Sequence, residues 1–385
     1  MPSQPHPTAL SETGDKLLLT PGPLTTSAAV KEAMLHDWGS RDAEFMRINR
    51  EVIERLTELA GGTGTHVTVP LQGSGTFAVE AMITNFVPRT GKLLLLVNGA
   101  YGKRAQRMAE IAGLEHAVLE TPENVPVSPQ SVAQRLEADP RITHVFLVHC
   151  ETTSGILNPL ADIAQTTRRM GKALLVDAMS SFGAIALDVR RLGIAALAAS
   201  SNKCLEGVPG MAFVVAEKQA LSASAGNARS LAFDLLEQWS ALEKTGQWRF
   251  TPPIHVIVAL HKALEEHRAE GGVAGRCQRY HGNCRILVDG MRRLGFKTLL
   301  ADGLQAPIIV TFHMPADANF VFQTFYDRLK DLGFVIYPGK LTVADSFRIG
   351  CIGRIGAEHM QAALKTIEAV LDDMNVARRA PDLAA

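Results

Sequence analysis

The chain has 385 residues, with 39 basic and 39 acidic side chains, and 46% of its residues are hydrophobic. This length and balance are typical of a globular protein with one large and one smaller domain. The zero net charge excludes a general attraction to nucleic acid or to an acidic membrane surface, so any bound anion requires a local site.

The five cysteines are scattered, and no pair has the CxxC spacing of a zinc site or the pattern of a disulfide framework. The polar, proline-containing stretch 1–15 lacks the apolar segment of a secretory leader. No apolar run approaches the ~20 residues of a membrane span. We therefore expect a cytoplasmic protein with no metal, no membrane association and no nucleic-acid partner.

Short apolar runs alternate with longer amphipathic stretches over the first two thirds of the chain. The strands expected there are Leu93–Val97, His144–Val148, Ala173–Val176, Leu197–Ser200 and Met211–Val215. The expected helices are Phe77–Phe86, Gly102–Ala112, Val132–Glu137 and Pro159–Met170. This alternation predicts an α/β domain whose mainly parallel sheet has helices on both faces.

The pattern changes around Gly271 and Gly272, where helices become interleaved with three short strands. The expected elements are Arg276–Leu294, Ile308–His313, Phe320–Leu332, Phe334–Tyr337, Ser346–Ile349 and Ala357–Met374. We predict a loose N-terminal segment at residues 1–16, a large domain at 17–270, a small α+β domain at 271–377 and a tail at 378–385.

The first segment with chemical potential is 71–77, Leu-Gln-Gly-Ser-Gly-Thr-Phe, a glycine-rich entry to an expected helix. Its backbone N–H groups, its hydroxyls and the positive end of the helix dipole all suit an anion. No lysine follows the second glycine, so the segment is not a Walker A loop. By itself, a helix entry without a ligand explains the segment equally well.

An acid and a lysine end two of the expected strands, where ligands of an α/β sheet collect. Asp177 follows an apolar run, and a buried carboxylate there requires a partner, although a helix cap is the simpler alternative. Lys203 follows another run, between small polar residues and a glycine-proline turn. A desolvated lysine amine can attack a carbonyl, whereas this segment alone also fits an exposed loop lysine.

The order and spacing of the three segments favour one cofactor. Pyridoxal 5'-phosphate (PLP) needs a helix N-terminus for its phosphate, an acid for its ring nitrogen and an amine for its aldehyde. No GxGxxG motif follows the first strand, which argues against a dinucleotide site. We predict a PLP enzyme in which Lys203 holds the cofactor as a Schiff base and Asp177 pairs with the ring nitrogen.

Segments spread over nearly the whole chain resemble the class V, fold-type I PLP aminotransferases. They are 17–26 (LLLTPGPLTT), 71–76 (LQGSGT), 98–102 (NGAYG), 151–155 (ETTSG), 176–183 (VDAMSSFG), 201–204 (SNKC), 247–251 (QWRFT), 335–340 (VIYPGK) and 346–350 (SFRIG). The resemblance implies a large PLP-binding domain of fold type I with a small C-terminal domain.

The resemblance also implies roles for individual residues. Lys203 would carry the cofactor and move the substrate proton, and Asp177 would hold the proton of the ring nitrogen. The remaining cofactor contacts would come from Ser74, Gly75, Thr76 and Asn202 at the phosphate, Tyr101 at the ring face and Thr153 near the ring hydroxyl. Thr251 of the partner subunit would add a phosphate contact in a homodimer with a shared active site. Arg348 would bind the substrate anion beside the backbone of Gly22.

The activity implied by the resemblance belongs to phosphonate catabolism. The amino group of 2-aminoethylphosphonate would pass to pyruvate, giving phosphonoacetaldehyde and alanine, so the partners are small molecules. An alanine–glyoxylate or serine–pyruvate transaminase of the same class is the main alternative. A cysteine desulfurase or other PLP lyase would need a mobile cysteine, whereas Cys351 follows an expected strand. A non-catalytic PLP-binding regulator is disfavoured because Lys203, Asp177 and Arg348 are all present.

Three features have no role in this scheme. The segment 37–41 is an expected entry loop without assigned contacts. Cys351 has no expected function. The basic run 104–107 is interpreted as a solvated helix face.

Overall fold

The computed structural model describes residues 9–340 and 344–382. Within these residues, the largest sheet has seven strands in the order β2-β10-β9-β8-β5-β3-β4. They are β2 (His66–Gln72), β3 (Lys92–Val97), β4 (Glu115–Glu120), β5 (Ile142–Val148), β8 (Ala173–Asp177), β9 (Ile194–Ser200) and β10 (Met211–Glu217). β10 runs antiparallel to both β9 and β2, and the other pairs are parallel. The predicted mainly parallel sheet is confirmed.

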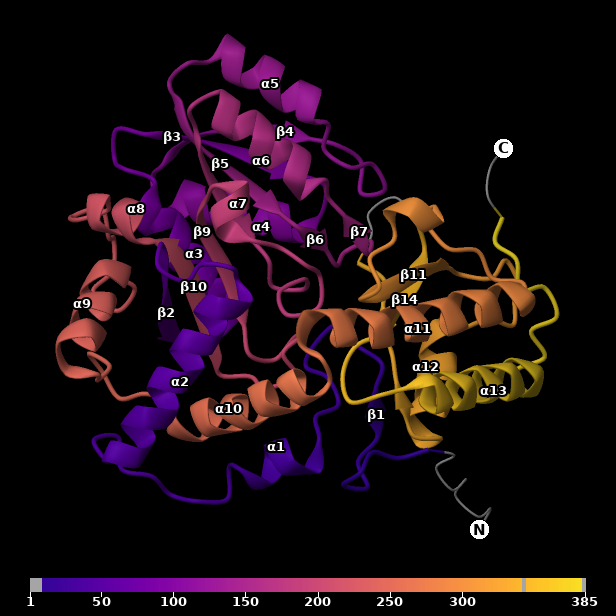
Figure 1. Ribbon diagram of the computed structural model, residues 1–385. Helices are drawn as coiled ribbons and strands as arrows, with labels where there is room; N and C mark the ends of the chain where they lie inside the picture. Colours follow the sequence, from indigo (N-terminus) through magenta and orange to yellow (C-terminus); the bar gives the residue numbers. More distant parts are fainter. Residues whose placement is uncertain (1–8, 341–343, 383–385) are drawn as a thin grey trace.

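Helices cover both faces of this sheet (Figure 1). One face packs against α2 (Ala43–Leu59), α5 (Pro129–Ala138), α6 (Leu160–Arg169), α7 (Val189–Leu192) and α10 (Ile254–Ala269). The other packs against α3 (Gly75–Phe86), α4 (Ala100–Ile111), α8 (Lys218–Ala223) and α9 (Leu235–Thr245). Strand β5 explains this double burial, because Val145 and Leu147 enter one core while Phe146 and Val148 enter the other.

Strand β2 forms one edge of the sheet. Pro70 lies within it and has no backbone N–H, which is why proline is tolerated at an edge rather than in a central strand. The carbonyl of Pro70 accepts a hydrogen bond from the side-chain amide of Gln238 on α9, at 3.4 Å. Helix α9 therefore lies against this edge.

The C-terminal part is built around a smaller antiparallel sheet of order β11-β14-β13. Its elements are α11 (Gly272–Arg293), β11 (Ile309–His313), α12 (Phe322–Asp331), β12 (Phe334–Val335), β13 (Tyr337–Pro338), β14 (Ser346–Gly350) and α13 (Ala357–Asp373). The expected strand 334–337 is thus two short strands, of which β13 pairs with β14. Minor elements elsewhere are α1 (Ala28–Glu32), β6 (Cys150–Glu151), β7 (Ile156–Leu157) and a 3₁₀ turn (Asp302–Leu304).

The first strand joins this C-terminal part. β1 (Leu17–Leu18) pairs in parallel with β12, and Leu17 and Leu19 are fully buried in the same core as α11 and α13. In Figure 1, the indigo β1 lies among orange and yellow elements. The start of the chain therefore adds to the C-terminal core rather than to the large sheet, and the domain boundary at residues 270 and 271 stays a prediction.

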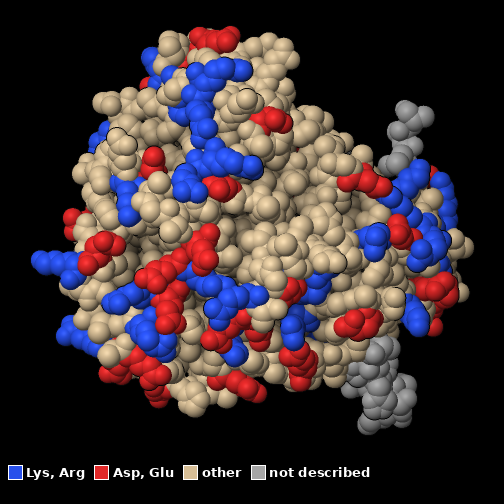
Figure 2. All heavy atoms as spheres, in the orientation of Figure 1, with Lys and Arg blue, Asp and Glu red and all other residues tan. Residues whose placement is uncertain are grey.

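Charged side chains of both signs are interspersed over the face shown in Figure 2. Among the residues that the structure describes, no helix has the length and apolar character needed to cross a membrane. The same part of the chain contains no group of His, Cys, Asp and Glu side chains arranged to hold a metal ion.

Candidate active site

A cavity of about 330 Å³ lies where β5, β8 and β9 reach their carboxyl ends. Eight of the residues predicted from the sequence line it: Gly22, Ser74, Gly75, Thr76, Tyr101, Asp177, Asn202 and Lys203. They come from separate segments of the chain: most follow strands of the large sheet at its carboxyl end, and Gly22 comes from the segment after β1. Thr153, Thr251 and Arg348 do not line this cavity.

The first turn of α3 forms one end of the cavity. Ser74 is the N-cap residue, but its side chain makes no capping hydrogen bond, so the first N–H groups of the helix lack a side-chain partner. A Cβ added at Gly75 would lie 2.5 Å from the sulfur of Met179, so a larger residue there would displace the Met179 side chain. This helix end is open to an anion.

The neighbouring helix α4 is different, because a carboxylate of the protein occupies its N-terminus. Glu151 is fully buried, and its Oε2 accepts the N–H groups of Tyr101 and Gly102 at 3.2 and 3.3 Å. Burial raises the pKa of Glu151, and these hydrogen bonds oppose that shift. The N-terminus of α4 is therefore occupied by a side chain of the protein, whereas that of α3 has no side-chain cap.

Thr153 serves the same carboxylate. Its hydroxyl donates to Oε1 of Glu151 at 2.6 Å and accepts the N–H of Ala100 at 2.9 Å. The adjacent Thr152 lines the cavity instead. The ring contact that we predict for Thr153 therefore remains a prediction, and Thr152 is the threonine that this structure directs to the cavity.

Asp177 ends β8 and is 5% exposed. Its Oδ1 accepts the N–H of Met179 at 2.9 Å. Burial raises the pKa of Asp177 to about 6, the hydrogen bond from Met179 opposes the shift, and the charge of Glu151 adds to it. A cationic group placed against this carboxylate would favour its ionised form.

Lys203 follows β9, and its side chain extends toward the segment after β1. Its Nζ donates to the carbonyl oxygen of Pro21 at 2.6 Å. Burial lowers the pKa of Lys203, while the charges of Tyr101 and Asp177 act in the opposite direction. A partly desolvated amine of this kind is a better nucleophile at neutral pH than an exposed lysine.

A buried ion-pair cluster supports the backbone just after Lys203. The N–H of Glu206 donates to the carbonyl of Lys203 at 2.8 Å, and Glu206 adopts a left-handed conformation with φ 59°. Its Oε1 accepts hydrogen bonds from Arg279 at 2.8 Å and from the hydroxyl of Tyr280 at 2.6 Å. The lysine loop is therefore tied to helix α11.

A second acid completes this cluster. Glu270 accepts hydrogen bonds from Arg276 and Arg279, each at 2.7 Å. Burial raises the pKa of Glu270, but the two guanidinium groups outweigh it and hold the pKa at about 2. Arg276 also donates to the carbonyl of Cys204 at 2.5 Å. Two arginines and two glutamates thus neutralise each other at the junction with the C-terminal part.

Tyr101 lies in the first turn of α4 with two cations over its ring. The guanidinium carbon of Arg104 is 4.9 Å and Nζ of Lys340 is 5.3 Å from the ring centroid. Burial raises the pKa of Tyr101, but the charge of Lys203, a hydrogen bond with Thr152 and the two further cations outweigh it and lower the pKa. Arg104 is exposed, as our interpretation of its run as a solvated helix face expects, and it also lines the cavity.

Arg348 lies on β14 and is 3% exposed. Its Nη1 donates to the carbonyl of Thr152 at 2.8 Å and its Nε to the carbonyl of Pro338 at 3.1 Å. Burial lowers the pKa of Arg348, and the charge of Tyr101 opposes this shift. The guanidinium group therefore bridges the C-terminal sheet and the loop that lines the cavity.

Thr251 lies elsewhere in this chain. It lines a separate cavity of about 360 Å³ with Phe250, and Ser40 and Arg41 of the expected entry loop line the same cavity. Phe77, in the first turn of α3, is 43% exposed, and Phe250 is 52% exposed. Large exposed aromatic side chains of this kind are common where a protein partner binds.

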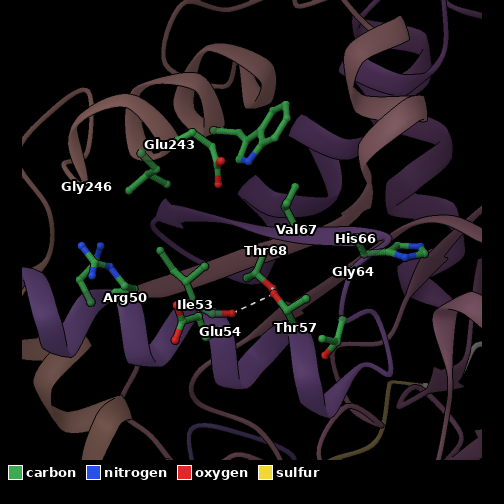
Figure 3. A pocket seen from close by; sticks show the side chains of 14 residues that line it. Arg50, Ile53, Glu54, Thr57, Gly64, His66, Val67, Thr68, Glu243 and Gly246 are labelled. Carbon is green, nitrogen blue, oxygen red and sulfur yellow. Dashed lines mark hydrogen bonds between the residues drawn. The ribbon is translucent and has the colours of Figure 1, made fainter.

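A larger cavity of about 480 Å³ lies between α2, β2 and α9. Figure 3 shows Arg50 and Glu54 extending from α2 and Glu243 extending from the helix opposite. The hydroxyls of Thr57 and Thr68 are 2.7 Å apart (Figure 3). The lining contains no lysine and none of the predicted site residues. Its chemistry therefore offers nothing to hold an aldehyde, and the cavity at the strand ends is the candidate active site.

A family model described as aminotransferase class-V matches residues 25–324. The chain belongs to the class-V aminotransferase family. Two relatives, from Pseudomonas putida and Pseudomonas aeruginosa, are each 54% identical to this aminotransferase over 360 residues. The alignments cover 94% of this chain and 98% and 97% of the relatives, and both relatives are named 2-aminoethylphosphonate–pyruvate transaminase.

Solved structures agree on the fold of this class-V aminotransferase. The ureidoglycine–glyoxylate aminotransferase of Bacillus subtilis has a TM-score of 0.86 at 23% identity, covering 94% of each chain. The pyridoxamine–pyruvate aminotransferase of Mesorhizobium loti has a TM-score of 0.85 at 23% identity, again covering 94% of each chain. The predicted fold-type I architecture and the predicted aminotransferase class are confirmed, and this family and fold are PLP-dependent.

Proposed function

We propose that this aminotransferase uses PLP to move the amino group of 2-aminoethylphosphonate to pyruvate, giving phosphonoacetaldehyde and alanine. The observation that carries the proposal is the 54% identity, over 94% of the chain, with relatives that bear the name of this reaction. The geometry of the cavity supports the cofactor chemistry independently of those names.

The cavity residues fit PLP at three points. The uncapped first turn of α3 suits the phosphate, with Ser74, Gly75, Thr76 and Asn202 as its expected contacts. Asp177 suits a protonated ring nitrogen, because burial without a cationic partner leaves its pKa raised. Lys203 suits the aldehyde, because its amine lines the same cavity.

When bound, PLP would supply an electron sink for charge that develops on the substrate carbon. Asp177 would hold the proton on the ring nitrogen and so keep that sink effective. With the substrate amine in its place at the cofactor, Nζ of Lys203 would be free to act as a base. It would take the proton from the substrate carbon and return that proton to the cofactor. The lowered pKa of Lys203 favours this base role near neutral pH.

Arg348 would bind the anion of each substrate in turn. A guanidinium group presents forked donors that match both a phosphonate and a carboxylate. The amino donor has no α-carboxylate, so its anionic group lies one carbon further from the reacting centre than the carboxylate of an α-amino acid. We propose that the backbone of Gly22 lines this substrate side of the cavity.

We further propose a homodimer in which Thr251 of the partner subunit completes the phosphate site. Two features support it: Thr251 lies away from the cavity of its own chain, and Phe77 next to the phosphate end is exposed. We also propose a cytoplasmic location, because the five cysteines are free, as in a reducing compartment.

Cys351 does not support a lyase. It is fully buried directly after β14, whereas a desulfurase would need a mobile thiol that reaches the substrate.

The decisive experiment is an amino-donor screen of the purified protein with pyruvate, scored by the alanine formed. The Lys203→Ala variant is the matched control, and it should form no alanine above background. We expect 2-aminoethylphosphonate to be a donor and serine and glycine to be poor ones. If serine or glycine with pyruvate or glyoxylate works at least as well as 2-aminoethylphosphonate, the alanine–glyoxylate or serine–pyruvate assignment replaces ours.

A further inference from the structure

Cationic side chains from two parts of the molecule converge near Tyr101. Arg104 and Lys340 lie over its ring at 4.9 and 5.3 Å, and the charge of Tyr101 acts on the pKa of Arg348. Arg104 comes from α4, whereas Lys340 and Arg348 come from the C-terminal part. The candidate active site therefore has more positive charge than one carboxylate substrate requires.

Lys340 and Arg348 belong to the same short hairpin. Tyr337 of β13 pairs with Arg348 of β14, and the N–H of Gly339 donates to the carbonyl of Ser346 at 2.9 Å. A Cβ added at Gly339 would lie 2.4 Å from that carbonyl oxygen, so glycine permits the close approach of the two strands. This backbone places Lys340 over the ring of Tyr101, whose charge also acts on the pKa of Arg348.

The three cations separate by position. Nη1 of Arg104 is 3.3 Å from the hydroxyl of Thr76 in the first turn of α3, so Arg104 belongs to the end expected to hold the cofactor phosphate. Lys340 and Arg348 remain for the substrate. One guanidinium group balances the single charge of pyruvate or alanine, whereas a phosphonate carries up to two negative charges.

We propose that Lys340 is a specificity-determining residue that pairs with the second negative charge of the donor phosphonate, while Arg348 pairs with the first. This inference rests on the proposed function. Lys340 provides a mobile point charge, which suits an anion that is present in one half-reaction and absent from the other. Lys340 therefore favours binding of the phosphonate donor over binding of carboxylate substrates.

The test compares Lys340→Met with Lys330→Met, which removes an exposed lysine on α12 of the same part of the chain. The amino-donor half-reaction of each holoenzyme is measured with 2-aminoethylphosphonate and with alanine. Lys340→Met should lower kcat/KM for 2-aminoethylphosphonate about tenfold, mainly through KM, as for loss of one charged contact. The same variant should change kcat/KM for alanine less than about twofold, and Lys340→Arg should restore most of the loss.

Two further dependences follow from a charge pair. Added salt should reduce the difference in kcat/KM for 2-aminoethylphosphonate between the wild type and Lys340→Met. The difference should also shrink below about pH 6, where a phosphonate, like a phosphate ester, takes up its second proton.

The outcomes separate the two proposals. If the wild type does not accept 2-aminoethylphosphonate, the proposed function and this inference both fail. If the wild type accepts it, but Lys340→Met loses activity equally toward both donors or toward neither, only the role of Lys340 is overturned. A melting temperature equal to that of the wild type shows that the variant is folded when these rates are compared.

Discussion

A Cβ added at Gly22 would lie 2.6 Å from Cδ and 3.0 Å from Nζ of Lys203, so the lysine side chain occupies the space that any other residue at position 22 would need. Gly22 also has a left-handed backbone, with φ +114°. Contact and conformation thus both require glycine beside the lysine that is proposed to carry the cofactor.

Gly22→Ala should therefore displace the Lys203 side chain and add backbone strain of about 1–3 kcal/mol. We expect borohydride to fix PLP to Lys203 in the wild type, as shown by peptide mapping, and to label the variant poorly. Gly14→Ala is the control, because Gly14 has φ +77° but nothing within 4 Å of its added Cβ. Equal labelling and equal activity of the two variants would show that Gly22 is not needed to position Lys203.

The apoprotein of Asp177→Asn should be more stable than the wild-type apoprotein at pH 8. Burial raises the pKa of Asp177 to about 6, above its ordinary value of 3.8, so folding disfavours the ionised carboxylate. The corresponding cost is on the order of 3 kcal/mol above pH 6, declines as the pH falls through 6, and is gone below the unfolded value. Urea unfolding at pH 8 and at pH 4 checks this.

The exposed Glu137 provides a control for Asp177, since Glu137→Gln should leave the stability nearly unchanged at both pH values. The activity of the holoenzyme should respond in the opposite direction to the stability of the apoprotein. Asp177→Asn removes the partner of the ring nitrogen and should lose nearly all turnover. A variant that is destabilised at pH 8, or that keeps a normal kcat, would contradict the role given to Asp177.

Thr251→Ala should release PLP more readily than the wild type, because one hydrogen bond to a charged acceptor contributes roughly 1.5–3 kcal/mol. Retention of the cofactor is measured by absorbance after gel filtration over a range of protein concentrations. Thr251→Ser should restore it, whereas Thr245→Ala, on the exposed end of α9, should have no effect. A monomer that is fully active would argue against a site shared between subunits.

Glu206→Gln should destabilise the fold by about 3 kcal/mol or more, because Arg276 and Arg279 would lose a buried counter-charge. The comparison is Asp373→Asn, which breaks a surface ion pair with Arg328 and should cost at most about 1 kcal/mol. The free energies of unfolding in urea measure both. Similar values for the two variants would show that the cluster does not stabilise the lysine loop.

The sequence predicts the parts of the site that lie on regular strands. Asp177 and Lys203 each follow an apolar run, and parallel strands carry their carboxyl ends to one edge, so their meeting in one cavity could be expected. The early elements α2 and β2 were not predicted. The apolar residues of α2, such as Phe45, Ile48 and Val52, follow helical spacing, and this signal could have found the helix.

Side-chain direction in tight loops is harder to predict. Thr152 and Thr153 are adjacent and chemically alike, yet only Thr152 lines the cavity while Thr153 binds Glu151. Arg104 shows the same difficulty, because it is exposed like the other arginine of its basic run and yet also lines the cavity. Its place three residues after Tyr101, on the same face of α4, is the one available signal.

The proline in edge strand β2 also affects how copies of this protein can associate. Open sheet edges recruit foreign strands through their unpaired N–H and carbonyl groups, which leads to aggregation. At this edge Pro70 has no N–H to donate, and Gln238 already occupies its carbonyl. Joining the sheets of two copies through this edge would produce a mismatched ladder. Strand β2 is thereby a poor template for further chains, although it is an edge strand.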